Sequence, residues 1–252
     1  MTTASDSALS RPVRITDVAP RDGLQNEPRP IPTDDKLRLV ELLCAAHVDE
    51  VEVTSFVSPR WIPQLGDADA LFAALQGKKP RDVVFSALVP NEKGMQAALR
   101  VNEDAGERLI DKVSVFTAAS ETFSQRNTNA TIAETLDRFK PVIESAKREG
   151  LLTRGYVSCA IACPFEGAIQ PDAVANVAMA LRDLGIDEID LGDTIGAGAR
   201  DSVARMLDAV IARAPLANAA IEAQTPTITL HLHDTFGRAG ECVRVALERG
   251  LR

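Results

Sequence analysis

The sequence predicts a parallel α/β fold of the TIM-type (β/α)8-barrel class. Short β-branched runs alternate with amphipathic stretches rich in Ala, Leu and Glu, and the pattern repeats about every 30 residues. Neighbouring parallel strands need a crossover of about a dozen residues or more, which the amphipathic stretches supply. The length of 252 residues also suits one such barrel. No Gly-x-Gly-x-x-Gly follows the first run and no Walker loop occurs, which argues against a doubly wound nucleotide-binding sheet.

Seven apolar runs are the expected strands, because each has the length of a buried parallel strand. They are Val13–Val18, Glu50–Ser55, Val83–Val89, Leu109–Phe116, Leu152–Cys159, Glu188–Leu191 and Thr227–Leu232. The expected helices lie near Asp34–Ala46, Ala68–Gln76, Glu92–Glu103, Ile132–Glu149, Asp172–Leu184, Ser202–Ala214 and Ala239–Arg249. Thr33 and the capping box of Thr131 with Glu134 mark helix starts, and Gly150 and Gly185 mark helix ends.

No linker or change of composition divides the chain, so we expect one incomplete barrel domain over residues 13–252 after a disordered segment over residues 1–12. The count gives seven strand–helix units, with the eighth missing. A barrel closes only when its eighth strand pairs with the seventh and the first. We therefore expect a longer natural product, a partner chain that fills the gap, or a strained seven-stranded barrel.

The composition excludes several classes of protein. A formal net charge of −8 argues against nucleic acid or an anionic membrane as the main partner. No apolar stretch is long enough for a membrane span, and residues 1–14 lack the apolar core of a signal peptide, so we expect a cytoplasmic protein. The spacing of Cys159 and Cys163 allows a metal site only with help from elsewhere, and reduced thiols are the favoured interpretation of all four cysteines.

Polar side chains stand at the expected C-terminal ends of the strands, where chemistry collects in this fold. They are Arg21 and Asp22 after the first strand, Glu52 within the second, Tyr156 in the fifth, Asp193 and Thr194 after the sixth, and His231 and His233 at the seventh. Two residues apart on a strand, His231 and His233 point to the same face. With a carboxylate such as Asp22 they would form an N,N,O site for a divalent cation. The alternative is that they are structural, as we expect for His47 on the first helix.

Arg21 and Glu52 each allow two interpretations. Arg21 either forms a structural salt bridge with Asp22 or stabilises a developing oxyanion while Asp22 binds metal. Glu52 lies among apolar residues, where a carboxylate is costly unless it is paired. Pairing with Arg21 or with the metal site would remove that cost, either as part of the base apparatus or as a purely structural contact.

Five segments carry a resemblance to a known family. They are Val18–Glu27, Thr54–Pro59 together with Trp61–Gln64, Arg154–Cys159, Leu191–Gly196 and His231–Thr235. In order and spacing, over roughly residues 13 to 250, they resemble hydroxymethylglutaryl-CoA lyases, members of a metallolyase barrel group that includes isopropylmalate and homocitrate synthases. The resemblance implies cleavage of 3-hydroxy-3-methylglutaryl-CoA to acetoacetate and acetyl-CoA, with leucine degradation as the expected pathway.

The resemblance also implies roles for residues. Mg²⁺ or Mn²⁺ would be held by Asp22, His231 and His233, with Arg21, Glu52 and His231 in the catalytic machinery. Tyr156, Asp193 and Thr194 would face the acyl-CoA substrate, and Asn127, next to Arg126, would lie near the CoA arm; the alternative for Arg126 is an ordinary surface residue. A homodimer is expected from the family.

Two departures leave other functions open. Family members continue into an eighth strand and a loop with a catalytic cysteine and a metal-binding asparagine, and neither has a counterpart here. Ala197–Arg200 also replaces a more usual Thr-Pro ending. The alternatives are a related 3-hydroxyacyl-CoA lyase or aldolase, and a truncated barrel that binds metal or a partner without catalysis.

Overall fold

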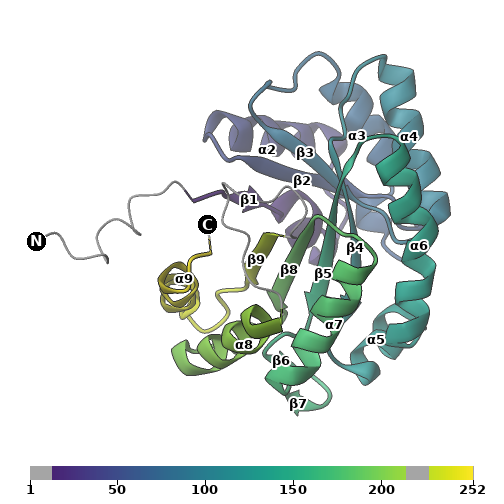
Figure 1. Cartoon of the computed structure of the whole chain (residues 1–252). Coiled ribbons are helices and arrows are strands. Elements are labelled where there is room, and N and C mark those ends of the chain that lie inside the picture. The colour runs from purple at the N-terminus through teal and green to yellow at the C-terminus, as the bar shows by residue number, and fades with distance from the viewer. Residues whose placement is uncertain (1–12, 214–226, 252) are drawn as a thin grey trace, which may run out of the picture. The chain divides into compact units, whose positions relative to one another are not determined.

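The computed structural model describes residues 13–213 and 227–251, in which strands and helices alternate along the chain (Figure 1). The strands are β1 (Thr16–Asp17), β2 (Glu50–Ser55), β3 (Val84–Leu88), β4 (Lys112–Ala118), β5 (Leu152–Ser158), β6 (Ala162–Cys163), β7 (Gly167–Ala168), β8 (Glu188–Asp193) and β9 (Thr227–Leu232). The helices are α2 (Thr33–Ala45), α3 (Ala68–Leu75), α4 (Glu92–Ala105), α5 (Glu121–Thr128), α6 (Ile132–Arg148), α7 (Pro171–Asp183), α8 (Arg200–Arg213) and α9 (Ala239–Glu248). Short helical turns cover Ala19–Gly23, Leu24–Asn26 and Pro63–Leu65.

The described strands form a seven-stranded sheet in the order β1-β2-β3-β4-β5-β8-β9, with β6 and β7 as a separate hairpin. The pairings of β1 with β2, β2 with β3, β3 with β4, β5 with β8 and β8 with β9 are all parallel. Strands therefore follow one another in chain order, each after a helical crossover. This confirms the predicted succession of seven parallel strand–helix units.

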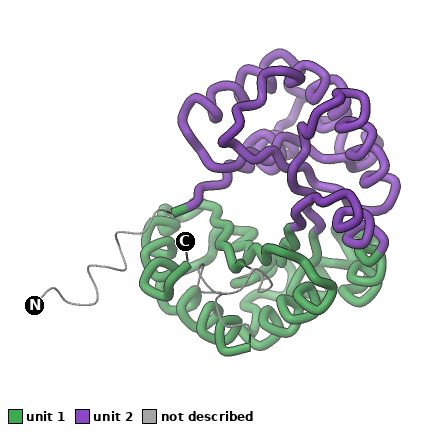
Figure 2. The backbone as a smooth tube through the Cα atoms, turned by 45° about the horizontal axis from the view of Figure 1, so that its top comes forward, with its two compact units in different colours: residues 1–13, 116–140, 154–252 green, residues 14–115, 141–153 purple. Residues whose placement is uncertain are grey.

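Two compact units divide the chain (Figure 2). Unit 2 comprises residues 14–115 and 141–153, and unit 1 comprises the remaining described residues. In unit 2 every residue of β2 is buried, and the rings of Phe56 and Phe72 stack at 6.0 Å. In unit 1 every residue of β8 is buried, α7 packs against α8, and α8 packs against α9. The expected single domain over 13–252 stays a prediction, and the expected disordered segment over 1–12 lies outside the described residues.

Local signals at the helix ends are mostly confirmed. The backbone N–H and hydroxyl of Thr131 both donate to the Glu134 carboxylate, and the Glu134 N–H donates to the Thr131 hydroxyl. Gly150 and Gly185 take left-handed backbone conformations, with φ of 67° and 80°. Thr33 differs: it is the first residue of α2 rather than its cap, and its hydroxyl donates to Asp67 at 2.7 Å.

The first strand is much shorter than predicted. β1 contains only Thr16 and Asp17, because the chain winds into a π-helical turn over Ala19–Gly23 immediately afterwards. In this turn the backbone N–H groups of Arg21 and Asp22 both donate to the carbonyl oxygen of Val18, at 3.1 and 2.7 Å. A strand cannot supply these bonds, so the turn ends it.

Two elements were not predicted. Helix α5 begins after Ser120, whose hydroxyl accepts from the N–H of Phe123 at 3.0 Å, and the β6–β7 hairpin follows β5. Both are polar or short and lack the apolar periodicity on which the other elements were recognised. Helix α8 begins two residues before the expected Ser202, and the expected end at Ala214 lies outside the described residues.

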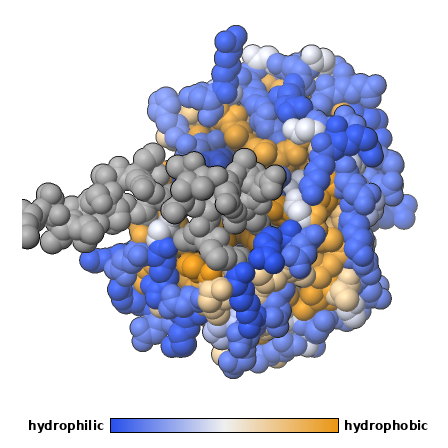
Figure 3. Space-filling view, viewed as in Figure 1, coloured by the Kyte–Doolittle hydropathy of each residue, from blue (hydrophilic) through white to orange (hydrophobic). Residues whose placement is uncertain are grey.

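Hydrophilic side chains surround smaller areas of hydrophobic ones on the face drawn in Figure 3. None of the helices in the described ranges combines the length and the apolar character that crossing a bilayer requires.

Candidate active site

The two predicted metal-binding histidines lie at the C-terminal end of β9 in unit 1. His231 belongs to the strand, opposite Gly192 of β8, and His233 follows directly after it. Their ring centroids are 5.0 Å apart with planes inclined at 31°. The two imidazoles therefore share one face, as strand alternation predicts.

Asp190 lies next to His231, and sequence reasoning missed it. One carboxylate oxygen, Oδ2, accepts from the Thr229 hydroxyl at 2.9 Å, and Oδ1 lies 3.5 Å from Nδ1 of His231. Burial of Asp190 would raise its pKa, but the interaction with His231 and the positive charge of Arg154 lower the pKa below its ordinary value. The sequence feature that could have identified Asp190 is its charge in the middle of an apolar strand.

Tyr156 of β5 also packs against His231. Its ring meets His231 edge-on, with centroids 5.7 Å apart and planes at 76°. The Tyr156 hydroxyl accepts from Nη1 of Arg154 at 3.3 Å, and Nε of Arg154 pairs with Glu188. Since Tyr156 is 5% exposed, it is held firmly beside the histidine.

The loop after β8 uses the predicted Asp193 and Thr194 to hold its own backbone. The Asp193 carboxylate accepts from the N–H groups of Ala197 at 3.0 Å and Gly198 at 2.7 Å. The Thr194 hydroxyl accepts from the N–H of Cys159 at 2.7 Å. These bonds fix the loop after β8 and tie it to the residue that follows β5; contact of either side chain with substrate stays a prediction.

Asn127 and Arg126 lie on α5, which is about 100 residues before β9 in the sequence. Asn127 is exposed, and the Arg126 guanidinium lies 4.2 Å from the centroid of the Phe165 ring. Arg126 is therefore engaged in a cation–π contact at the surface. A CoA-facing role for Asn127 stays a prediction.

The other predicted site residues lie together in unit 2. Nη1 of Arg21 is 2.5 Å from the Asp22 carboxylate, and Nε of Arg21 pairs with Glu52. The second oxygen of Glu52 accepts from the Ser114 hydroxyl, and the Glu52 side chain is fully buried. Arg21 thus removes the cost of the buried Glu52, one of the two pairings that the sequence suggested.

A buried lysine ties the loops after β1 and β2 together within unit 2. Nζ of Lys36 donates to the carbonyl oxygen of Gln64 and to Asp67, both at 2.5 Å. The Gln64 side-chain amide donates to the carbonyl oxygen of Glu27 at 2.8 Å. Asp67 also accepts from Thr33. The loop that follows Glu52 is therefore anchored to the segment that follows Asp22.

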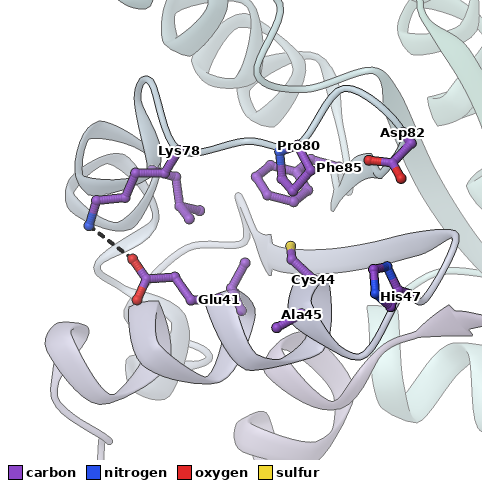
Figure 4. A pocket seen from close by; sticks show the side chains of 10 residues that line it. Glu41, Cys44, Ala45, His47, Lys78, Pro80, Asp82 and Phe85 are labelled. Atoms are coloured by element: carbon purple, nitrogen blue, oxygen red, sulfur yellow. Dashed lines mark hydrogen bonds and ion pairs between the residues drawn. The ribbon is translucent and has the colours of Figure 1, made fainter.

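His47 lies in a different place from the other histidines. It has φ of 60° just past the end of α2, the left-handed position in which a helix commonly ends. It lines a pocket of about 380 Å³ with Cys44, Asp82 and Phe85, across which Lys78 pairs with Glu41 (Figure 4). This pocket lies at the N-terminal end of β3, whereas Arg21 follows the C-terminal end of β1. The pocket is therefore at the opposite end of the parallel strands from Arg21. The structural role expected for His47 agrees with this position.

Comparisons with known proteins give the family. The family model described as HMGL-like matches residues 12–252. A Pseudomonas aeruginosa protein named 3-hydroxy-3-isohexenylglutaryl-CoA/hydroxy-methylglutaryl-CoA lyase is 43% identical, with 96% of this chain and 75% of that protein covered. The chain belongs to the HMGL-like family.

Solved structures agree on the fold. An HMG-CoA lyase from Brucella melitensis superposes with a TM-score of 0.85 at 46% identity, covering 95% of this chain and 78% of that one. An HMG-CoA lyase from Acinetobacter baumannii, in complex with coenzyme A and 3-methylmalate, has a TM-score of 0.82 at 31% identity, covering 100% and 75%. The fold is thus the TIM-type α/β fold that the sequence predicted, with seven strand–helix units in the described residues.

Proposed function

We propose that this chain is a divalent-metal-dependent carbon–carbon lyase that cleaves 3-hydroxy-3-methylglutaryl-CoA to acetoacetate and acetyl-CoA. The observation that carries the proposal is 43% identity, over 96% of the chain, to a relative named for this activity. The polar residues at the strand ends support it independently, because they supply the chemistry that the reaction requires.

Asp22, His231 and His233 are the proposed metal ligands. They offer one carboxylate oxygen and two imidazole nitrogens, and all three are half-buried. Such an N,N,O donor set suits a divalent cation, which we propose to be Mg²⁺ or Mn²⁺. When bound, the cation supplies Lewis-acid polarisation of the substrate's C3 hydroxyl and a fixed point for its carboxylate.

The reaction breaks the bond between C2 and C3 of the acyl chain. As the C3 hydroxyl loses its proton, the electron pair of this bond passes to the thioester as an enolate, and C3 becomes the ketone of acetoacetate. Protonation of the enolate at C2 then gives acetyl-CoA. The residues must therefore accept a proton at one end of the bond and stabilise negative charge at the other.

Arg21 is the proposed stabiliser of the enolate oxygen. Its guanidinium is fixed by Glu52 and by Asp22, so its charge is oriented before the substrate binds. Glu52 acts through Arg21 in this proposal, since its two oxygens accept from Arg21 and Ser114. His231 is proposed to contribute as a metal ligand and, when substrate is bound, to lie near the reacting C3 hydroxyl. Tyr156 lines the site next to His231.

Two further regions are proposed to contact the substrate. Asp193 and Thr194 set the loop after β8, and we propose that this loop faces the acyl group. Asn127, exposed on α5, is proposed to meet the CoA arm. The Acinetobacter structure named above contains coenzyme A, which supports an acyl-CoA as the substrate class.

The direct test is acetoacetate release from 3-hydroxy-3-methylglutaryl-CoA by the purified chain, with Mg²⁺ or Mn²⁺ and after EDTA treatment. We expect metal-dependent turnover. His233→Ala should lose most of its metal affinity, whereas His47→Asn, a change at the left-handed end of α2, should retain it. Unchanged metal affinity in His233→Ala would contradict the ligand assignment.

A second candidate differs in the branch on the acyl group. The Pseudomonas aeruginosa relative is named also for 3-hydroxy-3-isohexenylglutaryl-CoA, which favours testing longer branches. A panel of 3-hydroxyacyl-CoA thioesters separates the two: brisk cleavage of another thioester without cleavage of the methylglutaryl one would replace the first proposal. Metal-dependent stabilisation on heating without any acetoacetate, even at high protein concentration, would favour a non-catalytic metal-binding chain.

The homodimer and the cytoplasmic location stay predictions. A Danio rerio relative is named cytoplasmic and a Bos taurus relative is named mitochondrial. Sedimentation of the purified chain and localisation of the tagged protein test the two predictions separately.

A further inference from the structure

The carboxylate of Asp190 is buried between two strands beside a proposed metal ligand. Its side chain is 9% exposed, and Asp190 of β8 stands directly opposite Thr229 of β9. Oδ2 accepts from the Thr229 hydroxyl at 2.9 Å. Oδ1 has no hydrogen-bond partner within the described ranges, and it lies 3.5 Å from Nδ1 of His231.

This distance is an ion-pair contact, somewhat longer than a hydrogen bond. A buried carboxylate oxygen without a hydrogen-bond donor is destabilising unless a neighbouring group offsets this cost. Nδ1 of His231 lies 3.5 Å from this oxygen and would donate to it if the imidazole carried its proton on Nδ1. A shift of a few tenths of an ångström in the imidazole would complete the bond.

The imidazole is also restricted on a second side. Tyr156 meets it edge-on, and the Tyr156 hydroxyl is held by Arg154, itself paired with Glu188. The His231 ring therefore contacts both the Asp190 carboxylate, which Thr229 of β9 holds, and the Tyr156 ring of β5. An ordinary surface histidine has neither constraint.

We propose that Asp190 is a positioning residue that holds the proton of His231 on Nδ1 and so presents Nε2 to the metal. Metal-ligating histidines commonly donate their other N–H to a carboxylate, which fixes the tautomer and raises the basicity of the ligating nitrogen. Thr229 contributes by fixing Oδ2, so that Oδ1 faces the ring. The metal part of this inference rests on the proposed function, whereas the tautomer part does not.

The tautomer is measured in the metal-free protein by ¹⁵N–¹H NMR of histidine-labelled chain. Only three histidines occur, so His47→Asn and His233→Ala assign the signals. We expect His231 to carry its proton on Nδ1 in the wild type and to lose that preference in Asp190→Ala. Asp190→Asn should retain the preference, because its amide oxygen still accepts from Nδ1–H and its N–H₂ can donate to Thr229.

Metal affinity is measured by calorimetry with Mn²⁺ alone. Asp190→Ala should weaken binding by about 10- to 100-fold, the range found when such carboxylates are removed, and Asp190→Asn by less. Asp183→Ala is the matched control, since Asp183 is a 70% exposed aspartate of α7. It should bind Mn²⁺ as the wild type does.

Wild-type Mn²⁺ affinity in a folded Asp190→Ala variant, or an unchanged His231 tautomer, would overturn the inference. Circular dichroism and the isosteric Asp190→Asn variant identify a failure to fold. If the wild type itself does not bind Mn²⁺, the proposed metal function fails. The NMR measurement on the metal-free protein still decides whether Asp190 sets the tautomer.

Discussion

A side-chain carbon at Gly196 would lie 2.5 Å from the carbonyl oxygen of His233 and 2.6 Å from the Thr235 hydroxyl. Gly196 also has φ of 67°, which disfavours any other residue. The loop after β8 therefore touches the backbone of the second proposed metal histidine, and this contact is possible only without a side chain. Gly196 sets how closely the loop can approach His233.

Replacing Gly196 with alanine should move His233 and weaken the metal site. The matched control is Gly237→Ala, because Gly237 has φ of 69° but nothing within 4 Å of an added carbon. Both variants should lose about 1–2 kcal/mol of stability from the left-handed backbone, and Gly196→Ala should lose more because its added carbon also clashes with His233 and Thr235. Only Gly196→Ala should also lose Mn²⁺ affinity, by about tenfold or more, the equivalent of about 1.4 kcal/mol. Equal Mn²⁺ affinity in the two variants, measured by calorimetry, would contradict this role.

Glu52→Gln should reduce both stability and turnover, because it removes one of the two carboxylate partners of the buried Arg21 and leaves only Asp22. Removing one member of a buried pair costs up to about 3–5 kcal/mol. The exposed pair of Lys78 and Glu41, with side chains 47% and 46% exposed, is the comparison, and Glu41→Gln should cost less than about 1 kcal/mol. Urea unfolding measures the stability. Turnover of folded Glu52→Gln at the wild-type rate would show that Glu52 is structural only.

How much the sequence could predict depends on the range of each interaction. His231 and His233 were found because strand alternation is a local rule, and Glu52 because a carboxylate in an apolar strand is conspicuous. Asp190 was equally conspicuous, but its contact with His231 depends on the register between β8 and β9, which no local pattern contains. The Asp193 carboxylate accepts hydrogen bonds from backbone N–H groups of the loop that follows it. These bonds depend on the backbone conformation of that loop, which residue types alone do not specify.

The capping box at the start of α6 should make stability depend on pH. Hydrogen bonds from the backbone and hydroxyl of Thr131 lower the pKa of Glu134 below its ordinary value of 4.5. The stabilisation by this carboxylate is therefore fully present above the ordinary pKa and is lost as the pH falls through the lower pKa of the folded protein. Glu134→Gln keeps a capping side chain without the charge. The difference in Tm between wild type and Glu134→Gln should shrink on acidification; a constant difference would contradict the assignment.

The Lys36 contact that joins the two loops of unit 2 should show thermodynamic coupling. Lys36 has a 2% exposed side chain and Asp67 a 23% exposed one. Asp67→Asn should be the more harmful change, by about 3–5 kcal/mol, because it leaves the ammonium group buried without its counter-charge. Lys36→Met removes the charge itself and should cost about 1–3 kcal/mol.

In the double variant, Lys36→Met with Asp67→Asn, part of this loss should be recovered, which gives a coupling energy of about 1 kcal/mol or more in a double-mutant cycle. The same cycle on Lys140 and Asp137, with side chains 56% and 70% exposed, serves as the control and should give a coupling near that of ordinary surface pairs. Unfolding in urea supplies all the free energies. Additive losses at Lys36 and Asp67 would mean that the buried lysine does not tie the two loops together, and that their positions are set by packing alone.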